Sequence, residues 1–517
     1  MSSLRRLLPG DEGVPLHDTS ASRAIERLAL SGGPPHALIE RAGAAVARLA
    51  LALAPHAREV WVAAGPGNNG GDGLVAARWL KASGKSVHVT WLGRPDRLPA
   101  DAAHAHREAL HAGLTLHPPG VWPAARPEVA IDALLGLGQA RGPEGPLQAE
   151  VDRMNQWRGH GTRVLAVDLP TGLCPDTGRA LNQAVVTADA TLALLTAKPG
   201  LFTSQGRDAA GAIWLDDLGW GCELSSPGAG ARLSGRQDAL VALAPRLTAR
   251  HASHKGRFGD TWVVGGASGM SGAALLAARA ALKAGAGRVY CSLLDGGGES
   301  AASTNPELMQ RTWAAGHANG LANDATVICG CGGGEAVRAV LPELISRARQ
   351  LVVDADALNA LAADAGLARQ VVERARRGAA TVLTPHPLEA ARLLGVTASE
   401  VQADRLSAGS ALAKRFGAIV VLKGSGSVIA APGQPPVINP TGNARLATAG
   451  TGDVLAGWLG GCWSTQVQAG PANDGAMAAA IGTAWLHGRA AEAVSTGMPL
   501  VAGALIGSMA RLANRLA

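Results

Sequence analysis

The sequence has few of the residues that build disulfide frameworks and zinc centres. Its 517 residues include six cysteines, none of which forms a CxxC pair or lies at ligand spacing from histidines. Neither a zinc site nor a disulfide framework is indicated, and a reducing, cytoplasmic compartment fits this cysteine usage best.

Long apolar segments are also missing. The apolar run 42–55 is interrupted by Arg48 and is too short to span a bilayer. No apolar segment follows Arg5 and Arg6 near the N-terminus. We therefore expect neither secretion nor membrane insertion.

Charged residues make up 17% of the chain and aromatic residues 3%, whereas 47% are hydrophobic and 68 are glycine. This composition excludes disorder and predicts cores of small aliphatic side chains. The length favours two or more domains, at about 100 to 200 residues each. The net charge of +7 arises beyond residue 225. Without basic runs or a DNA- or RNA-binding motif, this excess favours an anionic small molecule over nucleic acid.

Apolar runs alternate with alanine-rich stretches along most of the chain. Strands are predicted at 60–64, 86–91, 129–135, 164–168 and 190–195, and again at 261–264, 288–292, 325–328, 351–353, 381–383 and 419–422. Helical stretches between them predict parallel sheets covered by helices. The pattern is lost in 218–236, which is rich in glycine and serine. We therefore expect two different α/β domains in tandem, at 1–225 and 237–517, joined by a linker at 226–236.

The first half has a glycine-rich segment, Gly65–Gly73, between a predicted strand and a helix expected from Leu74. Backbone N–H groups at such a place can bind phosphate. A nicotinamide dehydrogenase would carry an acidic residue at the end of the next strand, but that strand ends at Trp91. A tight turn that needs glycine at positive φ is the alternative. It does not explain the two asparagines and the aspartate in this segment.

Asp132 and Asp168 follow two further predicted strands, at the edge where open α/β sheets bind ligands. A helix N-cap is the alternative role for an aspartate there. The oxygens of Asn69, Asp132 and Thr171 are hard ligands that suit an alkali or alkaline-earth cation.

The second half contains no GxxxxGK[ST] segment, which disfavours a P-loop phosphotransferase. It has instead Gly450-Thr451-Gly452-Asp453 at the start of a predicted helix. The N–H groups there can bind a phosphoryl group, and Asp453 can take a proton from an attacking hydroxyl. A simple interaction with the helix dipole is the alternative. Polar turns at 354–359, 384–389 and 423–427 also follow strands and predict a crevice.

The first-half motifs Asn68–Gly73, Asp132, 167–172 and 196–200 resemble, in order and spacing, the NAD(P)H-hydrate epimerase domain, a Rossmann-like three-layer sandwich. The resemblance implies a K⁺ site at Asn69, Asp132 and Thr171, the last in place of a more usual serine. Asp168 is our choice for acid and base chemistry. The residues implied in contact with the damaged dinucleotide are Asn68, Asn69, Gly70, Gly71, Asp72, Gly136, Leu137, Gly138, Gln139, Ala140, Arg141, Gly142 and Asp168.

The second-half motifs, with 254–256, 265–273 and 330–332, resemble the ADP-dependent NAD(P)H-hydrate dehydratase, which has a ribokinase-like α/β/α fold. The resemblance implies Asp453 as the base and Mg²⁺ at the phosphates. Departures from the family pattern are Cys331 for proline, Ala449 for glycine and residues 444–446 for Pro-Gly-Met. The implied hydrate contacts are Ala273, Gly332, His386 and Asp453, and the implied ADP contacts are Lys423, Gly424, Ser425, Gly426, Ser427 and Gly452.

Together the two resemblances cover nearly the whole chain and imply a bifunctional repair enzyme. It would epimerise R- and S-NADHX and NADPHX, and then dehydrate the S form with ADP, giving NAD(P)H, AMP and phosphate. A ribokinase-type small-molecule kinase and a non-catalytic dinucleotide-binding regulator are the alternatives. We expect a cytoplasmic homo-oligomer that binds neither nucleic acid nor membranes.

Overall fold

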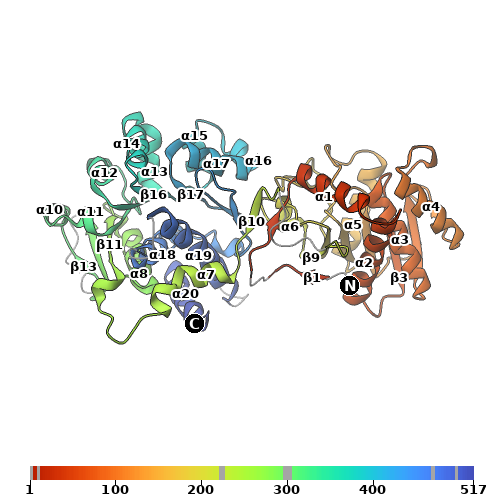
Figure 1. The fold of residues 1–517 in the computed structure, drawn as a ribbon, viewed down its shortest axis with the longest axis horizontal. Coiled ribbons are helices and arrows are strands. Elements are labelled where there is room, and N and C mark those ends of the chain that lie inside the picture. Colours follow the sequence, from red (N-terminus) through yellow and green to blue (C-terminus); the bar gives the residue numbers. More distant parts are fainter. Residues whose placement is uncertain are drawn as a thin grey trace. The chain divides into compact units, whose positions relative to one another are not determined.

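Two sheets organise the chain in the computed structural model, which describes residues 4–8, 12–220, 228–294, 305–466, 472–494 and 499–516 (Figure 1). Contacts divide the chain into one unit of Met1–Gly10 and Val14–Ala231 and a second of Asp11–Gly13 and Arg232–Ala517. The predicted boundary between residues 225 and 226 lies outside the described residues. None of the helices in the described part of the chain is long and apolar enough to cross a membrane.

The first unit is built on a sheet whose strands from β9 to β5 are all parallel, with β1 antiparallel at one edge. The predicted strands are confirmed, although the third, fourth and fifth end one or two residues early. In spatial order the strands are β1 (Arg5–Arg6), β9 (Ala212–Asp216), β8 (Ala190–Leu194), β7 (Arg163–Val167), β6 (Val129–Ala133), β3 (Glu59–Ala64), β4 (Ser86–Trp91) and β5 (Leu116–His117).

Helices cover both faces of this sheet. Val60 and Val62 of β3 pack with α2 and α3 on one face, and Trp61 packs with α5 on the other. This alternation is what a strand buried on both sides produces, and it makes the expected three-layer sandwich. The helices are α1 (Thr19–Ser31), α2 (Ala37–Leu53), α3 (Asn68–Ala82), α4 (Ala100–His111), α5 (Pro146–Gly159) and α6 (Gly206–Ala209); the short β2 (Pro15–Leu16) bridges to Ala197.

The glycine-rich segment differs from the prediction, because α3 begins at Asn68 rather than at Leu74. The glycines between Gly65 and Gly73 do not have positive φ, so the tight-turn interpretation is wrong. They allow close packing instead. A Cβ on Gly70 would lie 2.0 Å from the carbonyl oxygen of Gly65, and one on Gly73 would lie 2.5 Å from Ala133 Cβ. The first turns of α3 therefore rest directly on the ends of β3 and β6.

The second unit has a larger sheet in which β13 to β17 run parallel and a hairpin continues from β17. The six predicted strands are confirmed. The sequence did not predict the hairpin strands β18 and β19, or β10, which lies in the predicted linker. In order the strands are β13 (Met309–Gln310), β12 (Arg288–Leu293), β11 (Asp260–Gly265), β14 (Thr326–Cys329), β15 (Gln350–Val353), β16 (Ala380–Leu383), β17 (Ile419–Leu422), β18 (Ser427–Ala430), β19 (Val437–Asn439) and β10 (Ala231–Leu233).

Two helical layers enclose this sheet and complete the ribokinase-like α/β/α architecture (Figure 1). One layer holds α7 (Arg236–Leu247), α8 (Ser271–Ala284), α18 (Thr451–Thr465), α19 (Ala472–Glu492) and α20 (Ala502–Leu516). The other holds α11 (Leu321–Asp324), α12 (Val337–Arg347), α13 (Ala355–Ala363), α14 (Ala365–Arg376), α15 (Pro387–Leu394), α16 (Ala398–Ala403) and α17 (Arg405–Phe416), with α10 (Trp313–Ala318) beside it.

Candidate functional sites

A cavity of about 530 Å³ lies in the first unit, where the chain leaves the carboxyl ends of β3, β6, β7 and β8. This is the edge at which parallel α/β sheets bind ligands. Of the predicted contacts, Asn68, Asn69, Asp72, Gly136, Leu137, Gly138, Gln139 and Asp168 line it. The predicted residues Gly70, Gly71, Ala140, Arg141 and Gly142 are not among the lining residues.

Asp168 is paired in this cavity with Lys198, a residue that the sequence analysis quoted only as part of a motif. The Lys198 ammonium donates to Asp168 Oδ1 and also to the carbonyl oxygen of Leu194 at 2.9 Å. The lysine side chain is 2% exposed and the aspartate 11%. Asp168 has φ of 65°, a conformation that costs a non-glycine residue about 1 to 3 kcal/mol and that concentrates at functional sites.

Three more carboxyl groups line the same cavity, those of Glu26, Asp72 and Asp101. Burial, followed by the charge of Asp168, raises the pKa of Glu26 and raises that of Asp72 well above its usual range. The raised pKa of Asp72 favours its protonated form, which can donate a hydrogen bond. Glu26 and Arg23 come from α1, and no sequence signal indicated that this helix borders the site.

The structure brings together two of the three predicted cation ligands. Thr171 donates from its hydroxyl to Asp132 Oδ1 at 2.7 Å and from its N–H to Oδ2 at 2.8 Å. Asp132 is fully buried, and burial raises its pKa to about 6. Asn69 lies beside Gly136, where its amide Nδ2 is buried without a hydrogen-bond partner. Asp132, which has no cationic partner among the described residues, fits a cation bound by hard oxygens.

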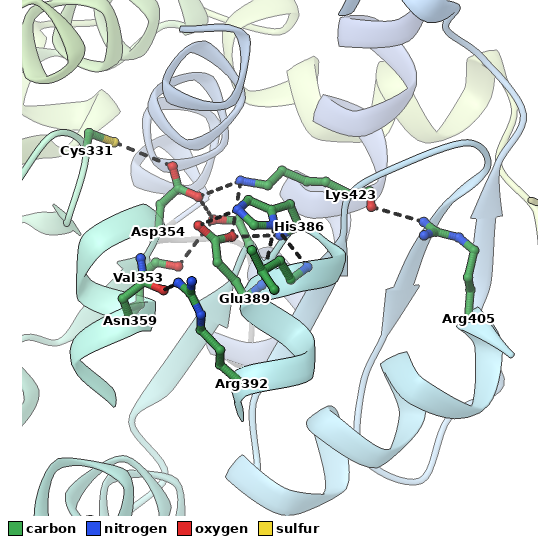
Figure 2. Close-up of polar contacts among 11 residues, drawn as sticks. Cys331, Val353, Asp354, Asn359, His386, Glu389, Arg392, Arg405 and Lys423 are labelled. Carbon is green, nitrogen blue, oxygen red and sulfur yellow. Dashed lines mark hydrogen bonds and ion pairs between the residues drawn. The ribbon is translucent and has the colours of Figure 1, made fainter. Parts of the chain in front are cut away.

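The residues predicted to form a crevice in the second unit follow the carboxyl ends of β14, β15, β16 and β17, which are parallel neighbours. Asp354 lies at their centre (Figure 2). Its Oδ1 accepts hydrogen bonds from Thr384 Oγ1 at 2.7 Å and Lys423 Nζ at 2.9 Å. The neighbouring Ala355 has φ of 47°, so the backbone is strained at this point also.

Asp453 lies in the first turn of α18, as predicted, and close to Asp354. Their carboxylate oxygens and Cys331 Sγ lie within 4.8 Å of one another. Burial, and then the charge of Asp354, raise the pKa of Asp453 to about 6. Burial also raises the pKa of the Cys331 thiol, so this residue in place of the family's proline is a neutral, apolar neighbour.

His386 caps α15, since its Nδ1 accepts from the N–H groups of Leu388 and Glu389 at 3.1 and 3.3 Å. Burial and the nearby Lys423 lower the pKa of His386, which favours a neutral ring. Burial raises the pKa of Glu389 to about 7. Figure 2 shows His386 and Glu389 beside the Lys423–Asp354 pair.

The remaining predicted residues lie around the same crevice. A Cβ on Gly332 would lie 2.9 Å from Ala273 Cβ, and one on Gly452 would lie 3.4 Å from Lys423 Nζ. Residues 423–427, which we call the nucleotide loop, connect β17 to β18. The sequence analysis missed His487, whose Nε2 donates to the carbonyl oxygen of Thr451 at 3.0 Å beneath the start of α18. Burial lowers the pKa of His487 to about 4.

Comparisons with known proteins match both halves. A family model described as NAD(P)H-hydrate dehydratase matches residues 261–505, and one described as YjeF-related protein N-terminus matches residues 35–200. A bifunctional NAD(P)H-hydrate repair enzyme of Escherichia coli is 36% identical over 82% of this chain and 79% of its own length.

Two further relatives match the second half alone. An ADP-dependent (S)-NAD(P)H-hydrate dehydratase of Neisseria meningitidis is 42% identical over 51% of this chain and 86% of its own. A crystal structure of the ADP/ATP-dependent dehydratase of Bacillus subtilis with ATP/Mg²⁺ is 26% identical. It covers 54% of this chain and 98% of that chain, with a TM-score of 0.42.

Proposed function

This chain belongs to the family of bifunctional NAD(P)H-hydrate repair enzymes, and we propose how its two units divide that repair. The first unit interconverts the R and S epimers of hydrated NADH and NADPH. The second dehydrates the S epimer to NAD(P)H with ADP as the phosphoryl donor. The observation that carries this division is that the residues of each predicted site converge within one unit, on the carboxyl edge of that unit's own sheet.

In the first unit, epimerisation requires proton transfer at the hydroxyl on C6 of the damaged ring. Asp168 is placed to move that proton, because Lys198 and the N–H of Leu194 both bind Oδ1 and leave Oδ2 for substrate. The contact with the lysine ammonium holds the carboxylate in one orientation. Asp72 lines the cavity, and its raised pKa favours a protonated carboxyl that could hydrogen-bond a substrate oxygen.

K⁺ fits the same unit. Asp132, Thr171 and Asn69 would hold it, since they supply a carboxylate, a hydroxyl and an amide oxygen. A bound K⁺ would offset the buried negative charge of Asp132 and stabilise the turn after β6 that lines the cavity.

In the second unit, Asp453 is the proposed base. It removes the proton from the C6 hydroxyl while that oxygen attacks the β-phosphorus of ADP and AMP leaves. The phosphate on C6 is then a better leaving group than hydroxide. The ring nitrogen supplies electron density as the C6–O bond breaks, and loss of a C5 proton restores the dihydropyridine.

Mg²⁺ would accompany the ADP phosphates and neutralise their charge. Asp354 is the carboxylate best able to hold it, because among the described residues its Oδ2 has only the weak donor Cys331 Sγ, at 3.8 Å. The predicted nucleotide contacts in the loop 423–427 and at Gly452 stay proposals, as do the hydrate contacts. The predicted homo-oligomer, the cytoplasmic location and the domain bounds at 225 and 237 also stay proposals.

The test is to incubate the protein with a mixture of R- and S-NADHX, ADP, Mg²⁺ and K⁺, and to follow recovery of dihydronicotinamide absorbance. We expect complete recovery, with AMP and phosphate as products. Consumption that halts with the R form left over would contradict the epimerase assignment. A phosphorylated product that accumulates would favour the kinase alternative, and the absence of turnover would favour the non-catalytic regulator. Both alternatives have less support, because each half matches a part of the repair enzymes.

A further inference from the structure

Arg405 is a fully buried cation directly beneath the nucleotide loop. It is 0% exposed at the start of α17, and its Nη2 donates to the carbonyl oxygens of Leu422 and Lys423, each at 3.1 Å. Its Nη1 donates to Gln402 Oε1 at 2.5 Å. Figure 2 shows the guanidinium reaching the backbone of Lys423 from below, while the Lys423 side chain points away toward Asp354.

This guanidinium has no counter-charge nearby. Among the residues that the structure describes, no carboxylate pairs with Arg405, and its buried Nε has no hydrogen-bond partner. Burial lowers the pKa of Arg405 to about 10, so it remains protonated at neutral pH. A buried cation of this kind is costly, and apolar replacements of buried charges are often tolerated or stabilising. We therefore expect Arg405 to have a role other than stabilising the fold.

The contacts of Arg405 also set the direction of the loop backbone. In a trans peptide the C=O and the following N–H point to opposite sides. Because the Lys423 carbonyl points down to Arg405, the N–H of Gly424 points to the outer face of the loop. In the described part of the chain no acceptor takes up that N–H.

Gly424 lies directly on the guanidinium. Its φ is 139°, and a Cβ there would lie 2.8 Å from both Nη1 and Nη2. Lys423, by contrast, is balanced by Asp354 at 2.9 Å and approaches Glu389 at 4.0 Å. The uncompensated positive charge under the loop thus belongs to Arg405 and not to Lys423.

We propose that Arg405 is a positioning residue for the nucleoside diphosphate: it holds the nucleotide loop with the Gly424 N–H facing outward and supplies the net positive charge that attracts the phosphates. This inference rests on the proposed role of residues 423–427 in binding ADP. It assigns to Arg405 an effect on the nucleotide alone, with none on the hydrated dinucleotide.

Arg374 provides a matched control. It is also buried in the second unit, at 1% exposure, and burial likewise lowers its pKa to about 10. Its guanidinium donates to the carbonyl oxygens of Ile345, at 3.2 Å, and Ala380, at 3.0 Å. Ala380 is the first residue of β16, so Arg374 lies at the edge of the sheet opposite the crevice.

The experiment compares Arg405→Met, Arg405→Lys and Arg374→Met in the full chain. We measure the ADP dissociation constant by calorimetry, the KM for ADP and for S-NADHX, the epimerase rate and the melting temperature. Arg405→Met should weaken ADP binding by about tenfold or more, as loss of a buried charged donor does. Its KM for the hydrate and its epimerase rate should stay within about twofold of wild type. Arg405→Lys keeps the charge but not the planar guanidinium, so its ADP dissociation constant should lie between those of wild type and Arg405→Met.

Arg374→Met should lower the melting temperature and leave ADP binding unchanged. Wild-type ADP affinity in a folded Arg405→Met chain, or an equal loss in Arg374→Met, would overturn the assignment. If the wild-type chain itself bound no ADP, the nucleotide site as a whole would be wrong.

If Arg405→Met does not fold, Gly424→Ala tests the proposal instead. It changes no charge and places a Cβ against the Arg405 guanidinium. Gly433→Ala is its control, since Gly433 has φ of 71° with nothing near its Cβ position. Weaker ADP binding in Gly424→Ala alone supports the proposal, and equal binding in the two variants contradicts it.

Discussion

At the scale of single residues, the two proposed acid–base groups sit in opposite electrostatic surroundings. Asp168 is in direct contact with the buried ammonium of Lys198. Asp453 lies among carboxylates, and burial and Asp354 raise its pKa to about 6. A pKa near the operating pH suits a general base that must take a hydroxyl proton.

Asp453→Asn should abolish ADP-dependent dehydration while ADP still binds. The amide keeps the size of the side chain at the start of α18 but cannot accept the hydroxyl proton. Removal of such a group costs about 10² to 10⁴-fold in rate. Calorimetric ADP binding and dihydronicotinamide recovery from S-NADHX measure the two effects separately. A near-normal rate would reduce Asp453 to a partner of the helix dipole.

Lys198→Met should slow epimerisation by a similar factor and leave dehydration of the S epimer unchanged. The substitution keeps the length of the buried side chain but removes the ammonium that binds Asp168 Oδ1. Dehydration in the same chain is the internal control for folding. Rescue by Lys198→Arg would indicate that the charge is sufficient, and full activity of Lys198→Met would exclude this role.

Asp72→Asn should stabilise the first unit at pH 8 and have little effect on its stability at pH 4. Burial raises the pKa of Asp72 well above its unfolded value, so the folded state holds a proton that the unfolded state has lost. Stability therefore falls as pH rises above the unfolded pKa, and an amide does not titrate. Thermal unfolding at the two pH values measures the difference. Epimerase activity should fall at the same time, because the residue lines the cavity.

Sequence patterns identified Asp168 and Asp453 because each follows a strand or starts a helix in a recognisable motif. The roles of Asp72, Lys198 and Arg405 depend on burial and on partners distant in sequence. Lys198 is 30 residues from Asp168, and Arg405 is 18 from Lys423. Asp72 was predicted as a substrate contact from its motif, but no local pattern distinguishes the roles of Lys198 and Arg405 from those of solvated charges.

At the scale of elements, α8 and α18 approach each other through glycines. A Cβ on Gly457 would lie 2.1 Å from the carbonyl oxygen of Ala277, and one on Gly461 would lie 2.3 Å from that of Ala281. The two glycines lie four residues apart on α18 and so share one face of the helix. Since Gly452 and Asp453 lie in the first turn of α18, this contact fixes the proposed base relative to the sheet.

Gly457→Ala should destabilise the second unit, although alanine favours helix by about 1 kcal/mol over glycine. The backbone oxygen at 2.1 Å cannot move without separating the helices, so we expect a net loss of about 1 to 3 kcal/mol. Gly503→Ala, in α20 with nothing near its Cβ position, is the control and should be neutral or stabilising. Chemical denaturation of both variants measures the difference, and equal effects would contradict the packing argument.

Strands and helices were predictable where the pattern of apolar residues along the sequence was clear. Buried parallel strands read as short apolar runs, and all six predicted in the second unit are present. The start of α3 was missed because glycine and asparagine have low helix propensity, and only the packing against β3 and β6 makes Asn68–Gly73 helical. The hairpin strands β18 and β19 are short, and the turn between them contains Gly433. The local sequence therefore does not distinguish these strands from a loop.

At the scale of the whole molecule, the residues predicted for the two reactions lie on separate sheets and include separate charged groups. A change confined to one unit should therefore leave the other reaction intact, which makes each activity an internal control for the other. The proposed cation site allows a sharp test of this independence, because Asp132 lies within the core of the first unit.

Asp132→Asn should weaken epimerisation, raise the K⁺ concentration needed for half-maximal rate, and leave S-NADHX dehydration within about twofold of wild type. The amide keeps an acceptor for Thr171 but removes the negative charge that a cation would offset. A second readout does not depend on turnover: K⁺ should raise the melting temperature of the wild-type first unit, because a ligand that binds only the folded state stabilises it. Na⁺ serves as the comparison ion. The Asp132→Asn chain should lose the rise in melting temperature that K⁺ causes. Equal K⁺ stabilisation in both chains would place the cation elsewhere, and equal loss of both reactions would show that the two units do not act independently.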